Sequence, residues 1–235
     1  MTGGGGGEFP TRWRAVCAYG LLALVLVATV VLPLATYWRG APVDAATMSV
    51  AGLFAGQAVL ASFLALWFAL RTPTSWRAFL PLPAGRWMAR IAEGVRVGVR
   101  GWLLTMGAVI GIGALLRTDA IAPHPGFAPL VLWMARRPIT LRLAVVATAM
   151  IVEEAFFRGF VQTRLGIVIA TLWFALAHMN YGSPMMGVGV FVIGAVLGRT
   201  YQRTGDLAIC AVAHGTFDAI QLLVVLPLIA SHLPS

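Results

Sequence analysis

Hydrophobic residues fill long stretches of the chain instead of alternating with polar ones. A helix that crosses the hydrocarbon layer of a bilayer takes about 20 residues. The stretches that reach or approach this length are residues 15–38, 45–70, 95–116, 139–160, 164–180, 185–200 and 206–230. Turn sequences, Gly-Ser-Pro at 182–184 and Thr-Gly-Asp at 204–206, separate the last three. The pattern predicts an all-α fold, a polytopic transmembrane helical bundle of about 7–8 helices.

The composition agrees with a membrane protein. The chain is 60% hydrophobic and 11% charged, whereas soluble domains carry roughly a quarter charged residues. All 17 basic residues are arginines that flank apolar segments, which indicates topology signals and attraction to anionic lipid rather than binding to nucleic acid. We expect an integral membrane protein with lipid as a partner. The absence of lysine is typical of a GC-rich genome and favours a bacterial plasma membrane.

The chain divides into three parts. Residues 1–11, with a run of five glycines, predict a disordered tail. Residues 12–138 hold the N-terminal transmembrane helices and a basic loop, and residues 139–230 hold the C-terminal transmembrane helices. The first span is too long for a cleaved signal peptide. The loop after the second span is predicted to be cytoplasmic, with the N-terminus on the same side, because it contains Arg71, Arg77, Arg86, Arg90, Arg96 and Arg100.

The acids and histidines inside the predicted spans are few and lie in the C-terminal half, together with Arg158, which is one helical turn from Glu154. Charge in hydrocarbon is costly unless it is paired, so such residues are functional candidates by default. The set is Glu153, Glu154, Arg158, His178, His214 and Asp218. Two cysteines, in apolar stretches, show no metal-ligand spacing.

Helical spacing separates the roles of these residues. Glu154 and Arg158 are four residues apart on one helix and can form an ion pair, so a structural role as a clamp explains both residues. Glu153 is turned about 100° away and remains the unpaired acid. His214 and Asp218 share a face of the last span. An isolated histidine is often only a partner in helix packing, but one acid and two histidines on neighbouring spans favour a site.

A glutamate and a histidine can share a water molecule and direct it at a carbonyl group, and a second histidine can donate to the oxyanion. Peptide hydrolysis is therefore the simplest chemistry for the set. Serine esterase and zincin motifs, GxSxG and HExxH, are absent from the sequence. The alternative is a non-enzymatic transporter or scaffold that uses the buried ions for coupling, although the sequence lacks the inverted repeats typical of transporters.

Three motifs in order resemble one known family. "EEAFFR" (153–158) fits E-E-x-x-x-R, "FALAH" (174–178) fits F-x-x-x-H, and "HGTFD" (214–218) fits H-x-x-x-N or D. Together they are similar to the CPBP family, which contains CAAX proteases and bacteriocin-processing enzymes. The resemblance covers residues 145–222. It implies an intramembrane endopeptidase with residues 139–230 as its catalytic transmembrane core. Its substrates would be membrane-associated, lipidated (CAAX-type) or small peptides, with bacteriocin self-immunity as a bacterial role.

The resemblance also implies roles for the residues. Glu153 would activate water with His178, while His214 and Asp218 would occupy the oxyanion position and Glu154 and Arg158 would brace the site. No cofactor is expected. Zinc held by Glu153, His178 and His214 is the alternative. The family motif commonly ends in Asn, and here Asp218 stands in its place. A protonated Asp218 could donate a hydrogen bond to the oxyanion as Asn does, whereas an ionised Asp218 could orient His214 or ligate a metal.

Overall fold

The computed structural model of the protein describes residues 7–40, 45, 47–80, 85–116 and 127–232. Every regular element in these ranges is a helix, which confirms the all-α prediction. Helical runs long and apolar enough to cross a membrane are Arg12–Trp38, Val50–Leu70, Trp87–Leu116, Ile139–Tyr181, Pro184–Thr204 and Leu207–His232. Residues 1–6 of the predicted disordered tail lie outside the described ranges.

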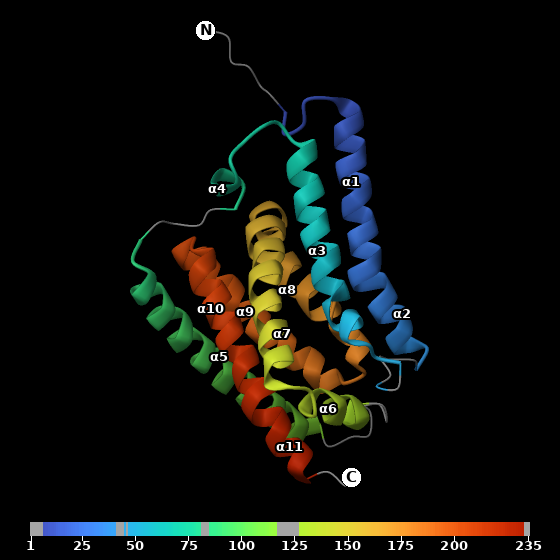
Figure 1. Ribbon diagram of the computed structural model, residues 1–235, viewed down its shortest axis with the longest axis vertical. Coiled ribbons are helices and arrows are strands. Elements are labelled where there is room, and N and C mark those ends of the chain that lie inside the picture. Colours follow the sequence, from blue (N-terminus) through green and yellow to red (C-terminus); the bar gives the residue numbers. More distant parts are fainter. Residues whose placement is uncertain (1–6, 41–44, 46, 81–84, 117–126, 233–235) are drawn as a thin grey trace.

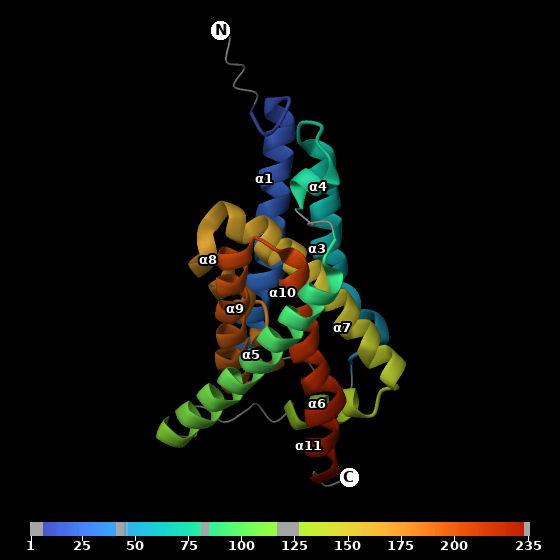
Figure 2. The ribbon, with the colours of Figure 1, turned by 90° about the vertical axis from the view of Figure 1, so that its left-hand side faces the viewer.

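The elements follow one another along the chain as a bundle (Figure 1). They are α1 (Arg12–Leu26), η1 (Val27–Val31), α2 (Leu32–Trp38), α3 (Val50–Leu70), α4 (Trp76–Phe79), α5 (Trp87–Leu116), α6 (Phe127–Ala135), α7 (Ile139–Glu154), η3 (Ala155–Gln162), α8 (Thr163–Leu176), η4 (Met179–Tyr181), α9 (Pro184–Thr204), α10 (Leu207–Ala219), η5 (Ile220–Val225) and α11 (Leu226–His232). Segments η1, η3 and η5 are wider π-helical turns, and η4 is a 3₁₀ turn. Helices α1 and α3 lie side by side, and α5 crosses α10 (Figure 2).

Two predicted boundaries are wrong. Helix α5 begins at Trp87 rather than at residue 95, so Arg90 lies on a helix and not in a loop. Arg90 is accommodated there by an ion pair of 2.6 Å with Asp206 at the start of α10. The chain also continues as a helix through residues 161–163 and breaks at Gly166, whose φ of 83° is readily adopted only by glycine.

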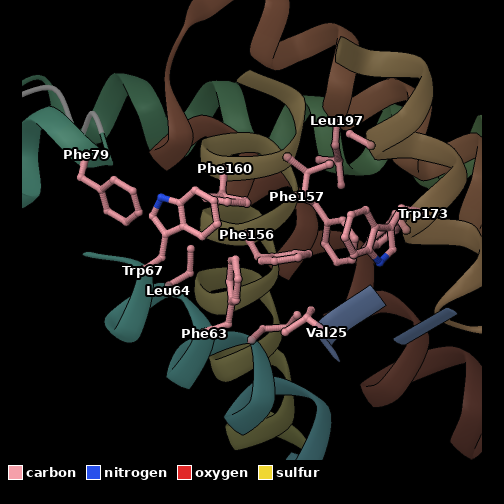
Figure 3. Packing of buried hydrophobic residues seen from close by; sticks show 14 of the residues in the cluster. Val25, Phe63, Leu64, Trp67, Phe79, Phe156, Phe157, Phe160, Trp173 and Leu197 are labelled. Carbon is pink, nitrogen blue, oxygen red and sulfur yellow. The ribbon is translucent and has the colours of Figure 1, made fainter. Parts of the chain in front are cut away.

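An aromatic cluster joins the N-terminal helices to the C-terminal ones (Figure 3). The Trp67 ring of α3 lies 4.7 Å from the Phe160 ring of η3, and Phe63 lies 5.5 Å from Phe156, both measured between centroids. Phe156 in turn lies 5.5 Å from Trp173 of α8. These edge-to-face pairs fix η3, and the residues just before it, against α3.

The outer faces of the helices expose large apolar side chains. Examples are Leu103, Leu104 and Ile110 of α5, with exposed fractions of 58%, 59% and 69%. Apolar surface of this extent is unfavourable in water and favourable in lipid. The described helices therefore have the surface of an integral membrane protein.

Glycines allow α5 and α10 to approach each other closely. A Cβ added at Gly98 would lie 2.5 Å from the carbonyl oxygen of Ala213 and 2.7 Å from Cβ of Thr216. Gly94 precedes it by four residues and is similarly blocked by Val212. Small residues at this spacing are a common packing device of membrane helices, where backbones touch without intervening side chains.

Replacement of Gly98 by alanine should therefore destabilise the protein, by about 1–3 kcal/mol from overpacking. Gly107→Ala on the same helix is the matched control, because a Cβ there meets nothing within 4 Å. The free energies of unfolding of both variants can be measured in detergent micelles. Equal stability of the two variants would contradict the close approach of α5 and α10.

Glu8, which lies outside the membrane-spanning helices, anchors the chain before α1. Its Oε1 accepts hydrogen bonds from Nη2 of Arg164 (2.6 Å) and Nε1 of Trp67 (3.1 Å). Partial burial raises the pKa of the Glu8 carboxyl, but the hydrogen bonds from Arg164 and Trp67 outweigh burial, so the pKa lies below its usual value. The contact thus favours the ionised carboxylate.

Because the pKa of Glu8 is lower in the folded state than in the unfolded state, the ionised carboxylate stabilises the fold at a pH above the unfolded-state pKa of about 4.3. This contribution to stability is lost as the pH falls through the folded-state pKa. Glu8→Gln lacks this titration. The difference in melting temperature between the wild type and Glu8→Gln should therefore shrink as the pH is lowered from 7 to 3. A difference that stays constant over this range would contradict the interpretation.

Candidate active site

The site lies where α7 passes into η3. Glu153 and Glu154 end α7 and are both buried, with exposed fractions of 8% and 1%. A π-helical widening, common at functional sites, follows immediately. His178 follows the end of α8, and His214 lies on α10 with Asp218 one turn later.

Glu154 is held by two cationic or polar partners. Its Oε1 accepts hydrogen bonds from Nη1 of Arg158 (2.9 Å) and from Nδ1 of His214 (2.8 Å). The other amino group of Arg158 donates to the carbonyl of Gly194 on α9 at 3.2 Å. The guanidinium also lies 4.7 Å from the centre of the Phe174 ring, a cation–π contact. The pairing of Glu154 with Arg158 expected from helical spacing is present.

His214 lies between two carboxylates. Its Nδ1 faces Glu154, and its Nε2 is 3.3 Å from Oδ2 of Asp218. A proton on each ring nitrogen satisfies both contacts, and the ring then carries a positive charge between two acids. The expected face shared by His214 and Asp218 is thus used for a direct contact.

Glu153 is held differently. Its Oε1 accepts a hydrogen bond of 3.2 Å from Nε2 of Gln57 on α3. Its Oε2 is buried, makes no hydrogen bond to any described residue, and lies 4.0 Å from Nε2 of His178. Nδ1 of His178 donates to the carbonyl of Phe174 at 2.8 Å, which leaves the lone pair of the neutral ring on Nε2. Two acceptors therefore face each other across the gap.

The width of this gap suits a water molecule. A water that donates one hydrogen bond to each acceptor, at about 2.8 Å, bridges two atoms 4.0 Å apart. Its oxygen lone pairs then remain free to attack. The arrangement can hold a nucleophilic water and accept its proton.

The six predicted residues form two neighbouring groups: Glu153 with His178, and a chain of contacts through Arg158, Glu154, His214 and Asp218. The ring of Phe174 lies beside both groups, 4.9 Å from the His178 ring and 5.8 Å from the His214 ring between centroids. The sequence interpretation missed Gln57 and Tyr181. Tyr181, in η4, has its ring 6.0 Å from that of His178, measured between centroids. Gln57 had a signal, because it is an amide within an apolar span; Tyr181 had none.

The alternative zinc site does not fit this geometry. Both ring nitrogens of His214 already face carboxylates, so the ring is not free to join Glu153 and His178 as a ligand. Across the described parts of the chain, no group of three His, Cys, Asp or Glu side chains is arranged to hold a metal ion. We therefore derive no step through a metal.

The fold and the site define a polytopic membrane protein with a buried acid and an imidazole across a water-sized gap. Residues 135–220 match the sequence profile of a family described as type II CAAX prenyl endopeptidase Rce1-like. This segment contains all three motifs, and the match confirms the resemblance inferred from them. Residues 135–220, the Rce1-like segment, are therefore the part of the chain that is similar to this family.

One curated relative is similar over part of its length. It is the uncharacterised protein YpbD of Bacillus subtilis (strain 168), 39% identical over 69 residues. The aligned stretch is 29% of this chain and 36% of YpbD, so the similarity spans about a third of the relative. No solved structure matches the chain.

Removal of Arg158 should unfold the site. Arg158→Met leaves Glu154 buried without its guanidinium partner, and breaking a buried pair in this way costs about 3–5 kcal/mol. Arg199→Met, at an exposed position of α9, is the control and should change little. The double variant Glu154→Leu/Arg158→Leu should recover part of the loss in the free energy of unfolding. Equal stability of Arg158→Met and Arg199→Met would show that the pair is dispensable.

Proposed function

We propose that the protein is an intramembrane endopeptidase that hydrolyses a peptide bond by means of a water activated by Glu153 and His178. The observation that carries the proposal is the gap of 4.0 Å between Oε2 of Glu153 and Nε2 of His178. One side of the gap is a carboxylate oxygen without a described partner, and the other is an imidazole nitrogen that the Phe174 carbonyl fixes as an acceptor.

The reaction balances with these groups alone. The water oxygen attacks the carbonyl carbon of the scissile peptide bond, and Glu153 takes one of its protons. When the C–N bond breaks, this proton passes to the leaving nitrogen. The products are a carboxylic acid and an amine, and Glu153 returns to its ionised form.

The oxyanion formed in this attack is assigned to His214. A ring with a proton on each nitrogen is a cationic donor. The contact of its Nε2 with Oδ2 of Asp218 is long, at 3.3 Å. The oxyanion can share the hydrogen on Nε2. Glu154 and Arg158 act through the other side of the ring, where they fix its orientation. Asp218 in this proposal orients His214, one of the roles that its acidic side chain allows.

The substrate follows from the environment of the site. Glu153 and His214 are buried and His178 is partly exposed within membrane-spanning helices, so the peptide must approach in or at the bilayer. The related family is described as CAAX prenyl endopeptidases. A membrane-associated, lipidated peptide of the CAAX type, or a small membrane-active peptide, fits both facts.

Loss of Glu153 should abolish cleavage. A fluorescence-quenched peptide that ends in a prenylated CAAX sequence, tested in proteoliposomes, should be cleaved by the wild type. Glu153→Gln and His178→Ala should each lower kcat/KM by about 10²–10⁴-fold, the contribution of general base catalysis. Glu93→Gln and His232→Ala are matched controls away from the site and should retain activity.

Full activity of a folded Glu153→Gln variant would overturn the proposal. The natural substrate can be sought in the same pair of proteins. Membrane proteomes of cells with the wild type and with Glu153→Gln should differ in peptides that accumulate uncut in the variant.

Metal-free hydrolysis is a separate prediction. The purified protein should contain zinc far below one equivalent by elemental analysis, and cleavage should survive exhaustive dialysis against EDTA. Stoichiometric zinc, together with loss of cleavage on chelation and its return on zinc addition, would contradict the prediction.

A further inference from the structure

We propose that Gln57 is a positioning residue of the reaction, and this inference rests on the proposed peptidase function. Its side-chain amide holds one oxygen of the Glu153 carboxylate and thereby turns the other oxygen to His178. Nε2 of Gln57 donates to Oε1 of Glu153 at 3.2 Å, while Oε2 of Glu153 faces Nε2 of His178. The proposal assigns a role in the site to a helix outside the Rce1-like segment, residues 135–220.

The placement of Gln57 is unusual for its helix. Helix α3 has 21 residues, and apart from the indole N–H of Trp67 only Gln57 and Ser62 have polar side-chain groups. An amide in a membrane span is costly unless it bonds. Gln57 is half-buried and bonds to a residue 96 positions away, at the point where α3 packs against α7. The one strongly polar side chain of α3 thus binds the proposed general base, Glu153.

The direction of the hydrogen bond follows from the charge of Glu153. An ionised carboxylate is only an acceptor, so it must face the NH₂ end of the amide rather than the oxygen. Gln57 is the one donor to Glu153 among the residues the structure describes. Without it, the carboxylate is free to rotate about its terminal torsion, which has a broad energy minimum. Oε2 would then leave the position that faces His178.

The amide oxygen of Gln57 argues against a purely structural role for this residue. Oε1 of Gln57 is buried and has no hydrogen-bond partner in the described part of the chain. A buried acceptor without a partner lowers stability. Methionine has a similar length and volume and lacks this cost, so Gln57→Met should fold with a melting temperature within a few degrees of the wild type.

The test is a comparison of kcat and KM. With the prenylated CAAX peptide, Gln57→Met should lower kcat about tenfold or more and change KM less than about twofold, because it disturbs the alignment of the base and not the binding of substrate. Ser62→Ala, at an exposed position of the same helix, is the control and should match the wild type. A wild-type kcat for Gln57→Met, or an equal loss through KM, would overturn the inference.

The outcome for Glu153 separates the two proposals. If Glu153→Gln is inactive and Gln57→Met is fully active, the positioning role fails and the peptidase stands. If Glu153→Gln cleaves normally, the peptidase proposal fails.

A measurement without substrate also tests the contact. The change in melting temperature caused by Gln57→Met should differ between the wild-type and Glu153→Gln backgrounds by about 2 °C or more, because the two side chains interact directly. Equal changes in the two backgrounds would show that Gln57 does not act on Glu153.

Discussion

The need to pair every buried charge organises this protein. Glu154 and Arg158 have exposed fractions of 1% and 2%, and charges in such surroundings must be neutralised by neighbours. Arg158, Glu154, His214 and Asp218 do this as a continuous chain of contacts that joins α7 and η3 to α10. Glu153 lies outside the chain, and one of its oxygens has no described partner. Arg158 and His214 both bind Glu154, so neither occupies Oε2 of Glu153, which faces His178 instead.

The fold fixes the positions of these groups. Residues of η3 bond to backbone carbonyls of α9, with Arg158 at Gly194 and Gln162 at Gly198. Aromatic contacts hold η3 against α3, which also brings Gln57 to Glu153. On the other side, the close approach of α5 and α10 depends on glycines such as Gly98. The N-terminal helices are therefore part of the site's construction, although they lie outside the Rce1-like segment.

Helical spacing predicted what lies on one helix and could not predict what lies between helices. The Glu154–Arg158 and His214–Asp218 pairs follow from a separation of four residues. The bonds from His214 to Glu154 and from Gln57 to Glu153 join residues 60 and 96 positions apart, which spacing does not encode. The boundary between the predicted spans 139–160 and 164–180 was misplaced for a similar reason: the break depends on the positive φ of Gly166, one of many glycines in the sequence.

The central claim is that Glu153 acts on a water and does not itself attack the peptide. A single turnover with excess enzyme in H₂¹⁸O, followed by mass spectrometry of product and enzyme, tests it most directly. The account predicts one ¹⁸O atom in the new carboxylate of the product and none in the enzyme peptide that contains Glu153. Label in Glu153 and unlabelled product would contradict it, because they would indicate a covalent anhydride.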